Sequence, residues 1–149
     1  MNKLKSAVYL ALPIISGSII GFIISDYIDY NVLQKPPLSP PSIFFPIAWT
    51  IIYILMGISY YIYKKNNNNV KTTFLYYSQL IFNLLWSIIF FMLKLRLLSI
   101  IWIILLDFLV ICLIIEISKE KKISAYLLIP YISWILFATY LTIGIYILN

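Results

Sequence analysis

The chain has 149 residues, of which 63% are hydrophobic and only 11% are charged, and its formal net charge is +6. A soluble domain has roughly 45–50% apolar residues, so a chain this apolar cannot hide its hydrophobic surface within one small soluble core. The composition predicts an integral membrane protein whose surroundings are the lipid bilayer. Its charges cluster in short loops between apolar runs, so they indicate membrane topology and not a nucleic-acid partner.

Two residue types that serve many enzymes are scarce. The sequence has no histidine and a single cysteine, Cys112, which lies in an apolar run. The commonest general base, the commonest neutral metal ligand and the usual proximal haem ligand are therefore missing, and no intrachain disulfide can form. We expect no metal site, no hydrolytic active site, and a buried, unreactive thiol at Cys112.

Five apolar runs follow one another along the chain, and each is about 20 residues or longer, the length of a helix that spans a bilayer. Open strands are excluded, because lipid offers no partners for unpaired backbone groups. The sequence therefore predicts an all-α membrane protein, a five-transmembrane-helix bundle that forms a single domain over residues 1–149. The expected helices are approximately 4–25, 43–63, 73–93, 97–117 and 123–148.

The first run is too long for the apolar part of a signal peptide, so we interpret it as a retained helix. Gly17 and Gly21 within it have the spacing that lets two helices approach closely, although ordinary small residues in a membrane helix explain the spacing equally well. The loop 26–41 that follows contains Pro36, Pro37, Pro40 and Pro41. Proline fixes φ and disfavours helix at the preceding residue, so this loop should be extended and stiff.

Basic residues divide unequally between the two ends of the predicted bundle. The N-terminus and the second and fourth loops carry eight of the eleven: Lys3, Lys5, Lys64, Lys65, Lys71, Lys119, Lys121 and Lys122. The other end carries Lys35, Lys94 and Arg96. The positive-inside rule then predicts a cytoplasmic N-terminus, an external C-terminus and an outward-facing loop 26–41, in a membrane that we expect to be a prokaryotic cell membrane.

Aromatic and polar residues recur at helical spacing within three of the runs. The residues that share a face are Trp49, Tyr53, Met56, Gly57 and Tyr60 in the second run, Gln79, Asn83, Trp86, Ser87 and Phe90 in the third, and Trp134, Ala138, Leu141, Thr142 and Ile145 in the fifth. An interior of aromatic rings with a few amides suits a binding site. Hydrogen bonds between helices explain the amides equally well, and plain packing explains the aromatic residues.

Asp107 lies near the middle of the fourth run, where an ionised carboxylate is costly. No lysine or arginine within any run can pair with it. It is therefore protonated, paired with a tyrosine or an amide, or exposed to a wet cavity. A structural role and a contact with a ligand both stay open for this residue.

Three blocks of sequence, in the same order along the chain, match a known membrane protein family. They are LQKPPLSPP at 33–41 with FPIAWT at 45–50, then the third-run residues from Gln79 to Phe91, and PYISWILFA at 130–138. On these blocks the chain resembles the TspO/MBR family, the translocator proteins that are also called tryptophan-rich sensory proteins or peripheral benzodiazepine receptors. The resemblance covers nearly the whole chain and implies a five-helix bundle with a ligand cavity under the first loop.

The resemblance implies a sensory or regulatory protein that binds porphyrins such as protoporphyrin IX, needs no obligatory cofactor and forms a homodimer. The expected ligand-binding residues are Trp49, Tyr53, Gln79, Asn83, Trp86, Asp107, Trp134 and Ala138. We expect Lys35, Pro36, Pro40 and Pro41 to form a lid over the cavity. With no histidine for the iron, the metal-free porphyrin is favoured over haem.

Two alternative functions stay open. Some bacterial relatives are linked to light-dependent porphyrin degradation, for which Trp49 and Trp134 match the implicated tryptophans. A transporter of small apolar or tetrapyrrole metabolites is the other, although five helices do not divide into two equal repeats. The sequence departs from the family pattern at Leu38 and Thr142, and it lacks the C-terminal cholesterol motif of the animal proteins.

Overall fold

The computed structural model describes residues 1–149 and is all-helical, with five helical segments long and apolar enough to cross a membrane, as the sequence predicts. The helices are α1 (Lys3–Ile24), α2 (Phe44–Lys64), α3 (Val70–Ser87), α4 (Arg96–Ser118), α5 (Lys122–Leu127) and α6 (Ile129–Leu148). Short 3₁₀ turns, η1 (Ser25–Tyr27) and η2 (Tyr30–Val32), follow α1, and a π-helix, η3 (Ile88–Met92), extends α3.

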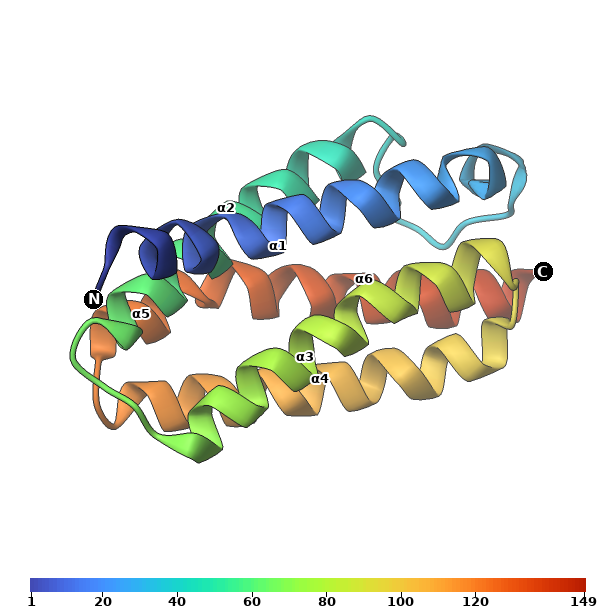
Figure 1. The fold of residues 1–149 in the computed structure, drawn as a ribbon. Helices are drawn as coiled ribbons and strands as arrows, with labels where there is room; N and C mark the ends of the chain where they lie inside the picture. Colours follow the sequence, from blue (N-terminus) through green and yellow to red (C-terminus); the bar gives the residue numbers. More distant parts are fainter.

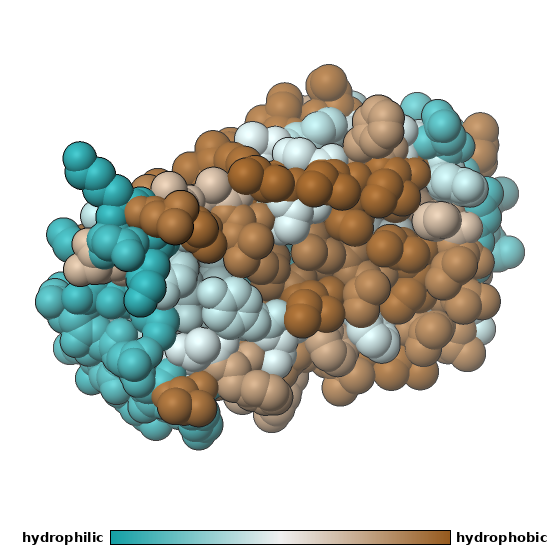
Figure 2. Space-filling model, in the orientation of Figure 1, coloured by the Kyte–Doolittle hydropathy of each residue, from teal (hydrophilic) through white to brown (hydrophobic).

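The helices run alternately up and down (Figure 1). The N-terminus, the α2–α3 connection and the α4–α5 connection lie at one end, while the α1–α2 loop, the α3–α4 turn and the C-terminus lie at the other, which we call the loop end. Helix α1 packs mainly against α2, whereas α4 packs against both α3 and α6. Figure 2 shows hydrophobic residues over the middle of the molecule and hydrophilic residues gathered at the N-terminal end, as expected for a bilayer-spanning bundle.

The structure does not have one continuous helix over 123–148, because the segment breaks at Leu128 between α5 and α6. Pro130 has no N–H and cannot continue the hydrogen-bond ladder of α5. At the break the backbone N–H of Leu128 donates to the carbonyl of Ala125, three residues earlier, at 3.1 Å, which is shorter in sequence than the four-residue spacing of an α-helix. The break allows α5 to pack on α2, where the Ser59 hydroxyl donates to the Ser124 carbonyl at 2.7 Å.

Helix α3 begins at Val70, three residues before the predicted start. The residue before it, Asn69, is the last of four asparagines in the predicted loop. Its side-chain oxygen accepts from the backbone N–H groups of Lys71 at 2.8 Å and Thr72 at 3.4 Å, so it caps the helix. The asparagine tract therefore has a structural role that its composition alone did not indicate.

Helices α1 and α2 approach each other closely at two glycines. A Cβ on Gly57 would lie 2.5 Å from the Leu10 carbonyl oxygen, and a Cβ on Gly17 would overlap the Tyr53 ring. A Cβ on Gly21 would meet no atom within 4 Å. Only the first glycine of the predicted Gly17–Gly21 pair is therefore used for close approach within the chain, and its partner surface is α2.

Replacing Gly57 by alanine should destabilise the bundle by about 1–3 kcal/mol, because the added methyl group forces α1 away from α2. The matched change Gly21→Ala should leave stability unchanged or slightly raised, since alanine favours helix over glycine. Unfolding of the two purified variants in the same detergent measures the difference. An equal loss of stability in both variants would contradict the close approach at Gly57.

Candidate functional site

A cavity of about 690 Å³ lies at the loop end between α1, α2, the α3–η3 segment and α6. It exists because α1 packs against α2 and does not close onto α6. Its volume falls in the range of about 300–1,000 Å³ that is typical of sites for drug-sized ligands. None of the side chains in its wall is charged. Such a wall favours an uncharged or mostly apolar molecule.

Five of the predicted ligand-binding residues, Trp49, Tyr53, Trp86, Trp134 and Ala138, lie in the cavity wall. The Trp49 ring lies 5.8 Å from that of Tyr53 at an angle of 28°, and 6.5 Å from that of Trp86 at 33°. Trp134 stands perpendicular to Trp49 at 6.4 Å. A flat molecule that stacks on Trp49 therefore meets the Trp134 ring edge to face, which is also a favourable aromatic geometry.

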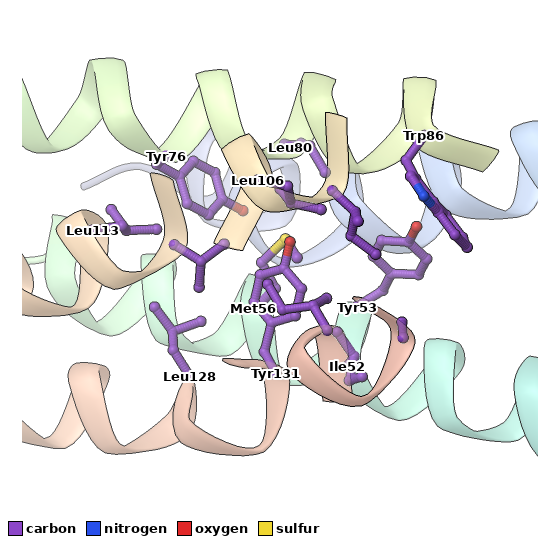
Figure 3. Packing of buried hydrophobic residues seen from close by; sticks show 14 of the residues in the cluster. Ile52, Tyr53, Met56, Tyr76, Leu80, Trp86, Leu106, Leu113, Leu128 and Tyr131 are labelled. Carbon is purple, nitrogen blue, oxygen red and sulfur yellow. The ribbon is translucent and has the colours of Figure 1, made fainter. Parts of the chain in front are cut away.

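The predicted residues Gln79 and Asn83 do not line the cavity; they lie in a buried hydrogen-bond network directly next to it. The Tyr53 hydroxyl donates to Asn83 Oδ1 at 2.6 Å, and Asn83 Nδ2 donates to the Tyr131 hydroxyl at 2.9 Å. The Tyr131 hydroxyl in turn donates to Gln79 Oε1 at 2.7 Å. Figure 3 shows Tyr131 and Tyr53 in the packed centre of the bundle beside Met56, whose sulfur accepts from Gln79 Nε2 at 3.5 Å.

Tyr131 is a residue of this network that the sequence reasoning missed. It is fully buried and joins the two amides of α3 to α6. Its position, three residues before Trp134 and seven before Ala138, puts it on the face of the fifth run that was already singled out, and this spacing could have revealed it. Tyr53 connects the network with the cavity, because its ring lines the cavity while its hydroxyl bonds Asn83.

Asp107 also lies outside the cavity wall, and the sequence reasoning did not foresee its partner, Thr139. The Thr139 hydroxyl lies 2.6 Å from Asp107 Oδ2 and 2.8 Å from the Ile135 carbonyl oxygen. One hydroxyl hydrogen cannot serve both oxygens. If a protonated Asp107 donates to Thr139 while Thr139 donates to Ile135, each of these three oxygens has a partner, whereas Asp107 Oδ1 is buried and has none. The geometry thus fits a neutral carboxyl that joins α4 to α6.

The residues expected to form the lid, Lys35, Pro36, Pro40 and Pro41, lie in the α1–α2 loop but not in the cavity wall. The connection between α1 and α2 contributes Ser25, Ile28, Tyr30, Asn31 and Ser42 to the wall instead. The proline segment follows the outer edge of α6, where a Cβ on Gly144 would lie only 2.5 Å from Pro36 Cγ. The proline segment therefore anchors the loop, and residues on both sides of it line the cavity.

Further contacts hold the loop in place. The Tyr140 hydroxyl donates to the Pro37 carbonyl at 2.6 Å, and the Asn149 amide exchanges two hydrogen bonds with the backbone of Gln34. The Tyr30 hydroxyl donates to the Pro40 carbonyl at 2.6 Å. Burial raises the pKa of Tyr30, with a smaller opposing contribution from a hydrogen bond with Ser39, so the phenol remains a donor at neutral pH.

The two residues at which the sequence departs from the family pattern, Leu38 and Thr142, have different surroundings. Leu38 has a left-handed φ of 70°, and its side chain is 86% exposed, outside the cavity wall. Thr142 lies in the wall, where its hydroxyl donates to the Ala138 carbonyl at 2.6 Å. The threonine therefore satisfies its own hydroxyl within α6 and presents little polar surface to the cavity.

Two indole N–H groups in the wall, those of Trp86 and Trp134, are buried and have no hydrogen-bond partner. The fourth tryptophan, Trp102, lies outside the cavity, and its indole N–H donates to the Phe82 carbonyl at 3.0 Å. Surrounding protein atoms shield both of these nitrogens, so a ligand in the cavity meets the ring carbons of the two tryptophans and does not reach their N–H groups unless the rings move.

Replacing Tyr131 by phenylalanine should lower the free energy of unfolding by about 1–2 kcal/mol, because Asn83 Nδ2 and Gln79 Oε1 each lose their buried hydrogen bond with the Tyr131 hydroxyl. Tyr126→Phe is the matched control, since Tyr126 is 68% exposed. Denaturant unfolding of both variants in detergent measures the effect. A Tyr131→Phe protein as stable as the control would show that the network contributes nothing to stability.

Comparison with known proteins agrees with these features. Residues 9–148 match the sequence model of the TspO/MBR family. The chain is 41% identical to Tryptophan-rich protein TspO of Archaeoglobus fulgidus, over 100% of this chain and 99% of that protein. It is 36% identical to the protein of the same name from Chlorobaculum tepidum, over 80% of this chain and 78% of that protein.

A eukaryotic relative is also similar over most of its length. The chain is 31% identical to Translocator protein homolog of Schizosaccharomyces pombe, over 93% of this chain and 88% of that protein. The match to the family model extends over nearly the whole chain and includes every wall and network residue described above. On this evidence, the five-span membrane protein with an aromatic cavity at its loop end belongs to the TspO/MBR family.

Proposed function

We propose that this protein binds a flat tetrapyrrole such as protoporphyrin IX in the cavity at the loop end and acts as a membrane sensor or regulator. The observation that carries the proposal is the uncharged cavity of about 690 Å³, walled by three tryptophans. Aromatic faces suit a conjugated macrocycle, which gains contact area and stacking energy on them. Light-driven degradation or transport would each require the same binding step, so binding is the function to test first.

The polar groups of the wall support the same ligand class. The wall contains polar side chains, among them Asn31 and Ser87, that suit a molecule with hydrogen-bonding atoms at its edge. The sequence has no histidine, the usual proximal ligand of haem iron. We therefore propose the metal-free form.

Replacing Trp49 and Trp134 together by phenylalanine should weaken protoporphyrin IX binding about tenfold, because each indole loses stacking area worth about 0.5–1.5 kcal/mol. Trp102→Phe is the control, since Trp102 stacks on Phe82 outside the cavity and its replacement should leave the affinity unchanged. The shift of the porphyrin Soret band on titration measures all three affinities.

The two negative results of this titration have different meanings. Unchanged affinity in the double variant would count against stacking on these two rings, while binding itself would stand. A wild-type protein that produces no Soret shift and no quenching of its tryptophan fluorescence would exclude the porphyrin.

We also propose that the N-terminus is cytoplasmic. Only three of the eleven basic residues, Lys35, Lys94 and Arg96, lie at the loop end, against eight at the N-terminal end, and the positive-inside rule places the end with more basic residues in the cytoplasm. A homodimer, which the family resemblance implies, is a further proposal that light scattering of the detergent-solubilised protein can test. Exposed apolar faces do not by themselves indicate a partner, because lipid covers them equally well.

The proposed orientation predicts which cysteines an impermeant reagent can reach. In a Cys112→Ser background, Leu38→Cys on the exposed loop should react with a membrane-impermeant maleimide in intact cells. Asn68→Cys, in the exposed α2–α3 connection, should react only after the membrane is permeabilised. The reverse pattern of labelling would place the N-terminus outside.

A further inference from the structure

A porphyrin that carries carboxylates meets a difficulty in this cavity. Protoporphyrin IX has two propionate groups on one edge, whereas no wall residue is charged. Burying an ionised carboxylate without a partner is very costly, so the propionates must lie where the protein supplies a cation. Only three cations lie at the loop end: Lys35, Lys94 and Arg96.

Lys35 is already engaged by the loop itself. Its ammonium donates to the carbonyls of Tyr30 and Leu33, both at 3.0 Å, and lies 4.9 Å from the centre of the Tyr30 ring. These contacts stabilise the backbone of the α1–α2 loop. Lys35 is therefore a poor candidate for a ligand carboxylate, which leaves the other two cations.

Arg96 and Lys94 lie beside the cavity wall. The Arg96 guanidinium carbon is 4.4 Å from the centre of the Phe90 ring, and Phe90 belongs to the wall. Both cations face Asp29: Arg96 Nη2 is 2.7 Å and Lys94 Nζ 3.6 Å from its Oδ2. Asp29 lies between two further wall residues, Ile28 and Tyr30, so the ion cluster borders the cavity from the loop as well.

The ion cluster leaves several groups unused. Asp29 Oδ1 and Arg96 Nε are both buried and have no hydrogen-bond partner. An arginine and a carboxylate usually form two parallel hydrogen bonds, whereas this pair forms one. Two cations share one carboxylate, so the cluster keeps one positive charge. Arg96 is also the first residue of α4, where the helix dipole favours an anion.

We propose that Arg96 and Lys94 form a carboxylate-binding subsite at the edge of the cavity, which Asp29 fills until a ligand propionate displaces it. This inference rests on the proposed porphyrin binding and adds where the acidic edge of the ligand lies. The displaced Asp29 belongs to the α1–α2 loop, so ligand binding removes the ion pairs that join this loop to the α3–α4 turn. The contacts of Pro37 and Gln34 with α6 stay in place.

The N-terminal end offers a matched control. There Glu116 Oε1 also pairs with two cations, Lys71 at 3.1 Å and Lys119 at 3.0 Å. The charge arrangement is the same, but none of the three residues lies in or beside the cavity wall. Glu116→Gln therefore removes an equivalent carboxylate without affecting the proposed subsite.

The test compares protoporphyrin IX with its dimethyl ester, which keeps the macrocycle and lacks the charges, in a non-ionic detergent. Asp29→Asn removes the competing carboxylate and should strengthen binding of the acid about three- to tenfold, the range of one hydrogen bond's net contribution, with the ester unchanged. Lys94→Gln and Arg96→Gln should weaken binding of the acid by similar factors. Glu116→Gln should change neither ligand.

Each outcome separates this inference from the proposed function. If the acid and the ester bind, and Asp29→Asn and Lys94→Gln leave their affinity ratio unchanged, the carboxylate subsite is overturned while porphyrin binding stands. If neither ligand binds the wild-type protein, the proposed function itself fails. Lys94 is half exposed, so its variant tests the subsite even if the Arg96 variant does not fold. Ester binding by each variant shows that its cavity is intact.

Discussion

The hydrogen bonds around the buried Tyr131 hydroxyl are the interaction on which the site depends. They join α6 to both amides of α3, and through Asn83 they reach Tyr53 of α2. In the bilayer core no water can replace a missing partner, so these helices are held in one register relative to each other. That register determines how the aromatic rings of the cavity wall are placed, because the Tyr53 ring stacks on Trp49 and the Trp134 ring stands perpendicular to Trp49.

The cavity itself follows from how α1 is attached. Its close approach to α2 at Gly17 and Gly57 fixes it on one side of the bundle and leaves space between α1 and α6. The π-helix η3 lies in the same wall and carries Phe90 toward both the cavity and Arg96. The α1–α2 loop covers the open end of the cavity. It is attached to α6 and the C-terminal residue through Pro37 and Gln34, and to the α3–α4 turn through Asp29. Its two attachments differ in chemistry, since one is made of neutral hydrogen bonds and the other of ion pairs.

Helical spacing predicted which residues share a face, but not which of them reach the cavity. Trp49, Trp86 and Trp134 line the cavity. Gln79 and Asn83 lie on the predicted face of α3, but both hydrogen-bond the hydroxyl of Tyr131 and do not line the cavity. The predicted face from Gln79 to Phe90 is about three turns long and meets different neighbours at different depths, and a periodic pattern carries no information about depth. Whether any of these residues contacts a ligand stays a prediction that the titrations above can test.

The sequence by itself determined the class of protein, the number of spans, their alternating direction and the family. These follow from local quantities: the length of each apolar run, the placement of prolines and basic residues, and blocks such as LQKPPLSPP. Only the tertiary structure decided where the cavity lies, that Pro130 interrupts the last span, and that Asp29 meets Arg96 across 67 positions of the chain. The reason is physical, because these features depend on contacts between distant segments, and such contacts are set by packing and partner geometry, which residue spacing within one helix does not specify.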